Sequence, residues 1–194
     1  YKNLISKYFF INKNKIKILP NYIDLDNFKF NLLKKKYPIN FLYLGRIESQ
    51  KNINFIIELF KNNKSFNVDI IGKGTKVKIY EKKIKKYDNI NLINKYFKNE
   101  ELVKIFNKYN FFILPSIYEG CPKILLEAMS NGMICFVFNI SNINELVSDQ
   151  ESGFYLDNNI NKTIKKINMI DDGIIEKISR TASLTATKNF NLNR

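Results

Sequence analysis

The sequence of 194 residues contains no histidine and only two cysteines. Without histidine a zinc site is strongly disfavoured, and neither a Ser-His-Asp triad nor a histidine general base can come from this chain alone. Cys121 and Cys135 fall in different predicted elements and form no CxxC motif. This cysteine usage fits a reducing, cytoplasmic setting.

Long hydrophobic segments are also absent. No apolar run approaches the roughly 18 residues that a membrane-spanning helix requires. The first ten residues mix Lys7 with aromatic side chains and lack the apolar core and cleavage site of a signal peptide. The sequence begins without methionine, and we expect it to be a piece of a longer chain.

Acidic residues are few compared with basic ones. Asp and Glu number 18 against 32 Lys and Arg, which gives a net charge of +14. Such an excess favours phosphates, nucleic acid or an anionic membrane surface as partners. A second interpretation is that lysines such as Lys82, Lys83, Lys85 and Lys86 only solvate helix faces in a Lys-, Asn- and Ile-rich sequence. The hydrophobic fraction of 45% predicts a globular domain with a real core.

Short apolar runs alternate with longer amphipathic segments. The strands predicted by the apolar runs are residues 17–19, 41–44, 68–71, 90–93, 111–114, 134–138 and 153–156. The predicted helices are residues 52–60, 75–87, 100–108, 122–131, 142–147, 159–170 and 172–188. Because the strands are continuous apolar runs, we expect them to be buried on both faces of a parallel sheet. The fold class predicted is therefore α/β, a Rossmann-like three-layer sandwich of about six parallel strands.

Three of these helices carry start or stop signals. Asn99 is the expected N-cap of the third predicted helix. Pro122 is the expected first residue of the fourth helix, which Gly132 ends. Asn142 and Glu145 have the spacing of a capping box at the start of the fifth helix.

In parallel α/β sheets, ligands bind beside the carboxyl ends of the strands. This rule directs attention to the loops at 45–51, 72–75, 94–97, 115–122 and 139–142. We expect a functional site to be assembled from these loops.

Two carboxylates stand at the most informative of these loops. Glu119 lies in the loop and Glu127 lies eight residues on, inside the following helix. The helix N-terminus between them offers free N–H groups and a positive dipole end, which suit a phosphate or sugar oxygen. Carboxylates also accept hydrogen bonds from sugar hydroxyls. Two alternatives stay open: Glu119 caps the helix electrostatically, and Glu127 forms a surface pair with Lys123.

Arg46 and Lys51 flank the loop that follows the second predicted strand. Two cations beside a helix start can neutralise a diphosphate leaving group. The alternative is that both are solvated loop charges in a lysine-rich chain. The segment Gly72-Lys73-Gly74 matches neither the GxGxxG pattern nor a Walker loop and fits a simple turn.

Taken in order, these motifs resemble the C-terminal domain of the GT-B glycosyltransferases of family 4, the glycosyl transferases group 1. The resemblance runs from about Lys17 to Phe190 and is carried by Asn21–Asp24 with Phe28, Leu44–Arg46 with Gln50–Asn52, Gly72–Gly74, Glu119–Pro122 with Leu126–Met129, and Glu145–Val147 with Gly153. Tyr22 replaces the glycine usual in the family, and residues 139–142 lack its common paired glycines.

By this resemblance, Arg46 and Lys51 hold the diphosphate of a nucleotide-sugar, and Glu127 binds the ribose hydroxyls. Glu119 binds a hydroxyl of the transferred sugar and positions the reacting face. Glu119, Arg46 and Lys51 are therefore the expected catalytic residues. Further residues expected to bind the donor are Gly45, Lys95, Gly120, Cys121, Lys123 and Ile124.

The resemblance also implies one half of a GT-B fold. Residues 1–14 are then a connector from a missing N-terminal acceptor domain, and residues 15–194 are the donor-binding domain, cut before its last crossover helix. The expected activity is the retaining, hexosyltransferase-type transfer of a sugar from a UDP-, GDP- or ADP-sugar to a hydroxyl acceptor, in surface polysaccharide, lipopolysaccharide or glycolipid synthesis. We expect no metal or other cofactor, and little or no activity from the isolated domain.

The expected partners are the nucleotide-sugar and the missing acceptor domain. An anionic membrane stays open as a peripheral contact, and nucleic acid is excluded because RRM, KH and helix-turn-helix signatures are lacking. The expected location is the cytoplasm, with the cytoplasmic face of the inner membrane left open. Two other functions also stay open: a non-catalytic sugar-nucleotide-binding module and a GT-B sugar-nucleotide epimerase.

Overall fold

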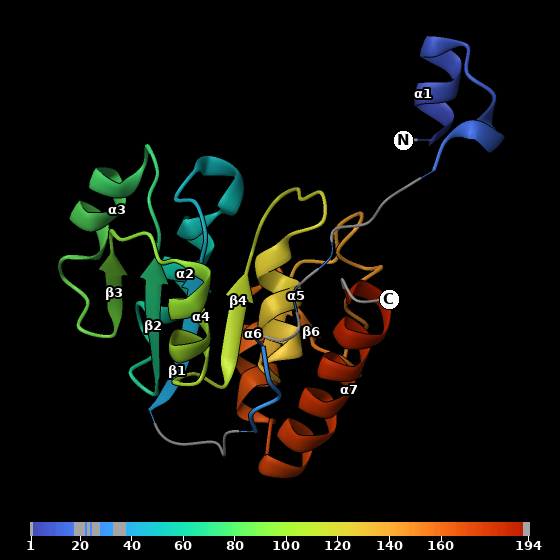
Figure 1. The fold of residues 1–194 in the computed structure, drawn as a ribbon. Coiled ribbons are helices and arrows are strands. Elements are labelled where there is room, and N and C mark those ends of the chain that lie inside the picture. The colour runs from blue at the N-terminus through green and yellow to red at the C-terminus, as the bar shows by residue number, and fades with distance from the viewer. Residues whose placement is uncertain (1, 18–21, 23, 25–27, 33–37, 192–194) are drawn as a thin grey trace.

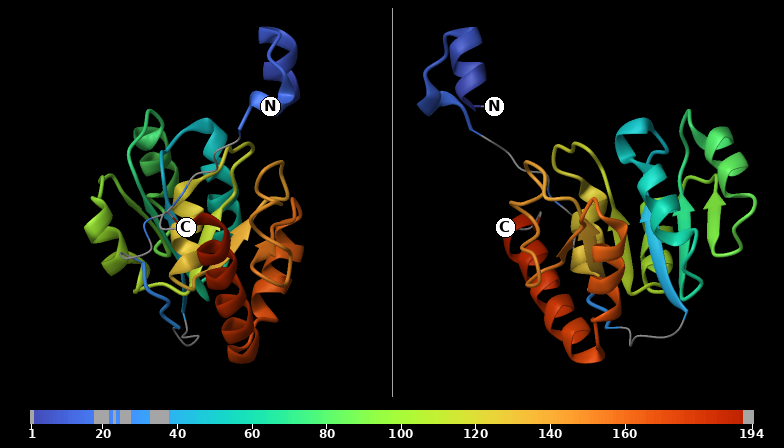
Figure 2. Two further views of the ribbon diagram at one scale, coloured as in Figure 1. Left: turned by 45° about the vertical axis from the view of Figure 1, so that its right-hand side comes forward. Right: turned by 180° about the vertical axis from the view of Figure 1, so that it is seen from behind.

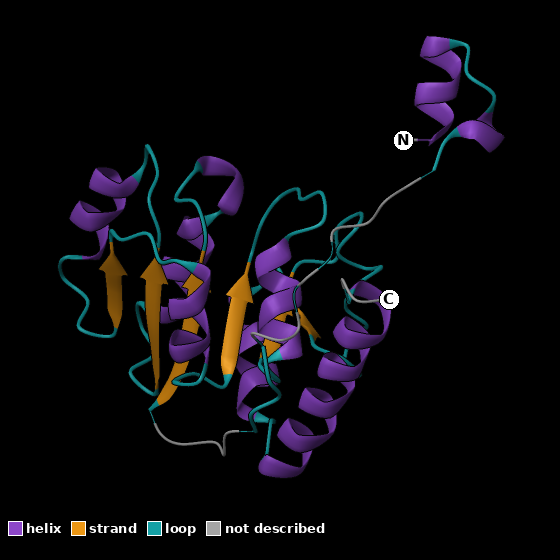
Figure 3. Ribbon diagram, in the orientation of Figure 1, coloured by secondary structure: helices purple, strands orange, loops and turns teal. Residues whose placement is uncertain are grey.

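The computed structural model describes residues 2–17, 22, 24, 28–32 and 38–191. Its centre is a six-stranded sheet in the order β3-β2-β1-β4-β5-β6, in which every neighbouring pair is parallel (Figures 1 and 3). The strands are β1 (Ile39–Leu44), β2 (Phe66–Ile71), β3 (Ile90–Ile93), β4 (Phe111–Leu114), β5 (Ile134–Val137) and β6 (Phe154–Tyr155). The predicted parallel sheet is therefore confirmed.

Helices cover both faces of this sheet. They are α2 (Ile53–Phe60), α3 (Val77–Ile84), α4 (Asn99–Phe106), α5 (Lys123–Ser130), α6 (Ile160–Asn168) and α7 (Asp172–Phe190), with the short 3-10 turn η2 (Ser49–Lys51). α2 contacts α6 on one face, and α5 packs along α7 on the other (Figures 1 and 2). The result is the predicted three-layer sandwich. Among the described residues, no helix combines the length and apolar character needed to cross a bilayer.

Phenylalanine side chains form the centre of the core. The Phe41 ring of β1 lies edge-on to Phe60 of α2, with ring centroids 5.1 Å apart. The Phe136 ring of β5 stacks on Phe154 of β6 at 5.3 Å. Burying one such ring stabilises the fold by about 1.5–3 kcal/mol. The strands are thus held firmly beneath the loops that follow them.

The strand order reverses between β1 and β4. The chain runs outward from β1 through β2 to β3, and it then returns to β4 on the other side of β1. The connections that leave β1 and β4 therefore pass to opposite sides, and a crevice opens between their loops at the carboxyl edge of the sheet. This topological switch point is where a doubly wound sheet binds its ligand.

The predicted helix at 142–147 is wrong. Residues 141–146 form consecutive turns. Asn142 has a φ of 72°, in the left-handed region, and its side-chain amide donates to the Glu119 carbonyl oxygen at 3.0 Å. An N-cap residue needs an extended backbone and a side chain that accepts from its own helix. Asn142 therefore cannot form the predicted capping box with Glu145.

Two helix starts differ from prediction by one residue. The N-cap position of α4 is Lys98 rather than Asn99, and the Lys98 N–H donates to the Glu101 carboxylate at 2.9 Å. Pro122 is the N-cap of α5 rather than its first residue. Gly132 follows α5 as predicted, with a φ of 85°.

The N-terminal segment lies apart from the sheet in all views (Figures 1 and 2). It contains α1 (Lys2–Phe9) and the 3-10 turn η1 (Lys13–Lys15), and neither element buries a residue. Lys17 has no regular structure, and the rest of the strand predicted at 17–19 lies outside the described residues. The division into a connector at 1–14 and a domain at 15–194 stays a prediction.

Candidate functional site

The loop that follows β1 is fixed by hydrogen bonds from two sides. The buried Tyr43 hydroxyl donates to the Arg46 carbonyl oxygen at 2.7 Å. On the other side, the Ile47 N–H donates to the Lys73 carbonyl oxygen at 2.9 Å, and the Lys76 N–H donates to the Ile47 carbonyl oxygen at 3.2 Å. Burial raises the pKa of Tyr43 far above its usual value, so its hydroxyl remains a donor at any working pH.

Glycine allows the loop after β2 to touch the loop after β1. A Cβ on Gly72 would lie 1.8 Å from the Gly45 carbonyl oxygen, and a Cβ on Gly74 would lie 2.2 Å from that of Ile47. Only a residue without a side chain permits this backbone approach. The predicted simple turn at 72–74 therefore has a second role, since it supports the loop that carries Arg46.

Glu48 joins the same two loops through its side chain. Its carboxylate accepts from the Thr75 N–H at 2.8 Å and from the Thr75 hydroxyl at 2.7 Å. These two hydrogen bonds lower the pKa of Glu48, because they favour its ionised form. Glu48 thus holds Thr75 at the start of the connection into α3.

A buried ion pair crosses the switch point. The Lys51 ammonium group donates to the Glu119 carboxylate, and each side chain is only about one-tenth exposed, at 10% and 9%. The same carboxylate accepts from the buried Ser116 hydroxyl at 2.6 Å. The Glu119 backbone is held as well, because its carbonyl oxygen accepts from Asn142. The structure therefore brings two predicted catalytic residues, Lys51 and Glu119, into direct contact, where they form an ion pair with each other.

Gln50 adds a second bridge between these loops. Its carbonyl oxygen accepts from the Ile117 N–H at 2.9 Å, and its side-chain oxygen accepts from the Tyr118 hydroxyl at 2.6 Å. Loops 45–51 and 115–122 therefore keep a fixed spacing through backbone, side-chain and ionic contacts.

Arg46 faces a cavity of about 250 Å³ at the carboxyl ends of β1, β2 and β3. No ion pair or side-chain hydrogen bond joins its guanidinium group to another residue of the described chain. Lys95 lies 4.4 Å from the Phe97 ring centroid, measured from Nζ, and faces the same space. The cavity is lined by Leu44, Gly45, Arg46, Gly72, Lys73, Lys95, Tyr96, Phe97, Leu102 and Ile124.

A second cavity of about 480 Å³ opens beside Glu119. It lies between the loop after β4 and the turns after β5, and it includes the predicted residues Glu119 and Gly120. Its lining is Ile117, Tyr118, Glu119, Gly120, Ile140, Ser141 and Asn142. The predicted donor residues Gly45, Arg46, Lys95 and Ile124 thus line the first cavity, and Glu119 and Gly120 line the second.

Glu127 lies on α5, one turn after Ile124. Residues three apart share a helix face, so its carboxylate is on the side of α5 that borders the first cavity. Burial raises its pKa, an effect that Lys123 partly opposes. The Glu127 carboxylate forms no hydrogen bond or ion pair with another described residue, so the surface pair with Lys123 is not present. A half-buried carboxylate without a partner is well suited to accept from a ligand.

The N-terminus of α5 lies beside the first cavity, which Ile124 lines. The N–H groups of Lys123 and Ile124 donate to no other described residue. Their orientation at a helix N-terminus favours an anionic oxygen. The described residues contain no cluster of three or more His, Cys, Asp or Glu side chains that could hold a metal ion.

Sequence reasoning missed several residues that build this site. Gln50 and Lys73 fall within the motifs that carry the family resemblance, but no role was predicted for either. Ser116 falls within the loop at 115–122 without a predicted role, and nothing singled out Tyr43 or Glu48. Each acts through a contact that depends on where two distant segments meet. The roles predicted for the site residues toward a donor stay predictions.

Comparison with known proteins places these motifs in a family. The pattern that defines the family described as "Glycosyl transferases group 1" matches residues 24–173. The chain is 26% identical over 210 residues to a UDP-Gal:alpha-D-GlcNAc-diphosphoundecaprenol alpha-1,3-galactosyltransferase of Escherichia coli, covering 98% of this chain and 54% of that protein. It is 31% identical to the capsular polysaccharide biosynthesis glycosyltransferase CapH of Staphylococcus aureus, covering 76% of this chain and 43% of that one. The chain thus spans about half the length of these relatives.

Solved structures of similar fold lead to the same group. The C-terminal domain of a glycosyl transferase group 1 family protein, LpcC of Francisella tularensis, superposes with a TM-score of 0.74 at 19% identity, covering 88% of this chain and 99% of that one. Anabaena Alr3699/HepE, solved in complex with UDP and glucose, gives a TM-score of 0.77 at 14% identity, covering 93% of this chain and 54% of that one. These likenesses show the fold, that of a GT-B glycosyltransferase C-terminal domain, and the sequence match shows that this chain belongs to the glycosyl transferases group 1 family.

Proposed function

We propose that this chain binds a nucleoside diphosphate sugar, and that the protein containing it transfers the sugar to a hydroxyl acceptor with retention of anomeric configuration. The observation that carries this proposal is the Arg46 guanidinium, which lines a cavity at the switch point and forms no ion pair with a described residue. A cation in that place stabilises negative charge that develops on a departing diphosphate.

Each predicted residue has a place that fits one part of the donor. Arg46 and the neighbouring Lys73 supply free positive charge for the diphosphate, and the α5 N-terminus supplies N–H donors. Glu127 offers an unpaired carboxylate for the ribose hydroxyls. Lys95 and the aromatic residues beside it line the outer end of the cavity, where the base would lie.

The sugar would lie next to Glu119, which already accepts from Lys51 and Ser116. A carboxylate has about four acceptor positions, so Glu119 can accept from a sugar hydroxyl without losing those two partners. Lys51 can in turn share its three donors between Glu119 and a diphosphate oxygen. The ion pair then holds both groups in place before the donor arrives, which limits the reorganisation needed in the transition state.

The relatives support a UDP-sugar and a role in polysaccharide synthesis. The Escherichia coli relative is named for UDP-Gal and a diphosphoundecaprenol acceptor, and a structure of Staphylococcus aureus TarM contains UDP. By analogy, we place the reaction in the cytoplasm, at the inner membrane face that presents a lipid-linked acceptor. Arg46 and Lys51 supply the positive charge that a divalent ion would otherwise provide.

Isothermal titration of the chain with UDP, GDP and ADP tests the proposal. At least one nucleoside diphosphate should bind in the presence of EDTA, and Arg46→Ala should weaken it about tenfold or more, since a charge-assisted hydrogen bond is worth about 1.5–3 kcal/mol. Arg180→Ala is the matched control, because Arg180 lies on α7 and pairs with Glu176. No binding of any of the three at millimolar concentration would exclude this function.

A further inference from the structure

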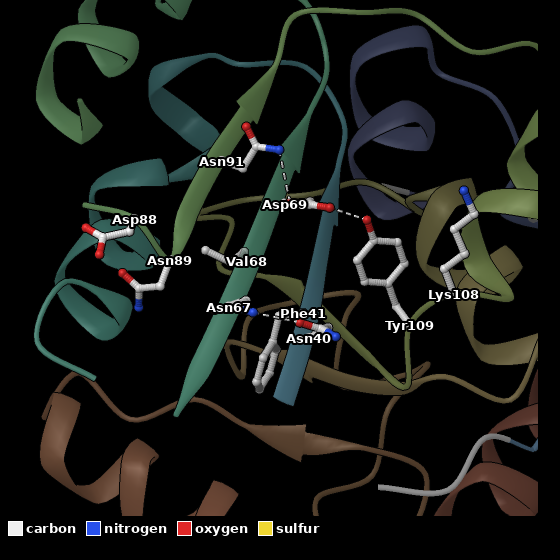
Figure 4. A pocket seen from close by; sticks show the side chains of 10 residues that line it. All are labelled: Asn40, Phe41, Asn67, Val68, Asp69, Asp88, Asn89, Asn91, Lys108 and Tyr109. Carbon is white, nitrogen blue, oxygen red and sulfur yellow. Dashed lines mark hydrogen bonds between the residues drawn. The ribbon is translucent and has the colours of Figure 1, made fainter. Parts of the chain in front are cut away.

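A third cavity, of about 380 Å³, lies at the opposite end of the sheet. Figure 4 shows it over β1, β2 and β3, with polar side chains from all three strands (Figure 4). Asn40 precedes Gly45 by five residues along β1, which corresponds to about 16 Å at the rise of a strand. The cavity is therefore separate from the donor site at the carboxyl edge.

Strand alternation places the polar residues on one face. Phe41 points toward α2, so Asn40 points to the other face. Asn67 is the register partner of Asn40, and Asp69 is that of Asn91, so these four side chains share that face. Leu42, nearer the carboxyl edge on the same face, is fully buried. The sheet thus changes from apolar to polar where its cover ends.

These side chains hold one another in fixed orientations. Asn67 donates to Asn40 at 3.1 Å, and Asn91 donates to Asp69 at 3.3 Å. The Tyr109 hydroxyl also donates to the Asp69 carboxylate. Desolvation of the Tyr109 hydroxyl, followed by its bond to Asp69, raises the pKa of Tyr109. The polar floor of the cavity is therefore ordered before any ligand is present.

Hydrogen-bonding capacity remains after these contacts. The Asn40 side-chain N–H groups and the side-chain oxygens of Asn67 and Asn91 bond to no other residue in the described parts of the chain. The floor therefore offers donors and acceptors in adjacent positions. A ligand that fits it must donate to one amide and accept from the next.

The lining selects among ligand classes. Two carboxylates, of Asp69 and Asp88, line the cavity against one ammonium group, of Lys108, and this balance disfavours an anion. The amide groups disfavour an apolar ligand. An extended peptide would pair with a strand edge, whereas this cavity lies on the sheet face. A hydroxyl group both donates and accepts, so adjacent sugar hydroxyls match adjacent amides. The cavity volume of about 380 Å³ falls in the usual range for sites that bind small molecules.

We propose that this cavity is a second ligand site, which binds one unit of a neutral sugar independently of the donor site. Such a site would let the enzyme retain a saccharide chain outside the reaction centre. It requires the side chains of Asn40, Asn67 and Asn91 and the Tyr109–Asp69 contact, and it requires none of the residues assigned to donor binding.

Side-chain amide signals in ¹H–¹⁵N NMR spectra of the labelled chain test this site. Titration with D-glucose, D-galactose and N-acetyl-D-glucosamine to about 100 mM covers the millimolar Kd expected of a shallow polar site. At least one sugar should shift the Asn40, Asn67 and Asn91 signals saturably, and UDP at saturation should leave the shifts unchanged. The absence of saturable shifts with all three sugars, or their loss when UDP is added, would overturn the proposal.

Matched variants localise the effect. Asn67→Ala should raise the Kd about fivefold to tenfold, because each lost neutral hydrogen bond corresponds to a few-fold in Kd. Tyr109→Phe keeps the ring, frees Asp69, and should raise the Kd about fivefold. Asn161→Ala, at an exposed position of α6, is the control and should leave the Kd unchanged. An unchanged Kd in both Asn67→Ala and Tyr109→Phe, with the backbone spectrum preserved, contradicts the site. Sugar binding without binding of UDP, GDP or ADP would instead refute the donor assignment alone.

Discussion

The Lys51–Glu119 pair should behave as a single electrostatic unit. Both side chains are about nine-tenths buried, and Ser116 is the only other described residue that bonds to the carboxylate. If one partner is removed, the other remains as an uncompensated charge with little access to water. Loss of one partner from a buried pair costs about 3–5 kcal/mol, whereas replacing both by apolar groups is often nearly neutral.

Two single variants and the double variant measure how strongly the two charges depend on each other. Lys51→Met and Glu119→Leu keep much of the side-chain volume, and each should lower the free energy of unfolding by about 3 kcal/mol. For a chain of this size that corresponds to a fall in Tm of about 6–12 °C. The double variant should be nearly neutral rather than lose the sum of about 6 kcal/mol, which gives a coupling energy of more than about 3 kcal/mol.

Urea unfolding of the wild type and the three variants measures the coupling. The surface pair Lys61–Glu58, with side chains 29% and 54% exposed, gives a matched control cycle that should show less than about 1 kcal/mol. If the losses at Lys51 and Glu119 add to within about 0.5 kcal/mol, the two charges do not depend on each other and the pair is not formed.

The same variants test the assignment of the diphosphate. In Glu119→Leu the Lys51 ammonium is no longer neutralised, so UDP should bind more tightly than to the wild type. In Lys51→Met, UDP should bind more weakly. If neither change alters the Kd for UDP, Lys51 has no contact with the diphosphate, whatever its contribution to stability.

Three further predictions concern the supporting residues. Gly74→Ala should lower the free energy of unfolding by more than about 2 kcal/mol, because the added Cβ clashes with the Ile47 backbone. Gly120→Ala is the control and should change the free energy of unfolding by less than about 0.5 kcal/mol, because no atom lies within 4 Å of the added Cβ. Equal urea midpoints for the two variants would contradict the loop packing. Tyr43→Phe should weaken UDP binding severalfold in calorimetry, because Arg46 loses its anchor; an unchanged Kd would show that the anchor is unnecessary. Burial raises the pKa of Glu127, so the folded state binds its proton more tightly than the unfolded state, and stability falls as pH rises through the raised pKa. Glu127→Gln should therefore have a higher Tm than the wild type at neutral pH and an equal Tm below about pH 4, and a pH-independent difference in thermal scans would argue against this origin.

The fold could be predicted because its signal is repeated along the chain. Each strand is an apolar run and each helix has a helical period, so errors at single residues do not alter the order of elements. The rule that ligands bind at carboxyl ends then directed attention to the loops that carry Arg46, Lys51 and Glu119. These loops do meet at the switch point.

The failures have a common physical cause. Asn142 and Glu145 have capping-box spacing, yet the Asn142 amide instead donates to the Glu119 carbonyl, in a loop 23 residues earlier. Gly74 looks like a turn glycine because its sequence neighbours say nothing of Ile47, 27 residues away. In both cases a long-range contact overrides a local preference, and a local pattern carries no information about that contact.

The Lys51–Glu119 pair illustrates the limit for a binding site. Sequence patterns assign each of these residues to a different part of a ligand, because residue type and spacing describe them one at a time. The structure joins them across 68 residues and surrounds them with Ser116 and Gln50. Without a donor, each charge needs a partner to remain buried, and the other predicted ligand-binding residue is the nearest group of opposite sign. Arg46, by contrast, has no ion-pair partner among the residues that the structure describes, and it borders an open cavity. We therefore expect an incoming anion to gain most interaction energy at Arg46. The Lys51–Glu119 pair keeps the two loops in place until the anion binds.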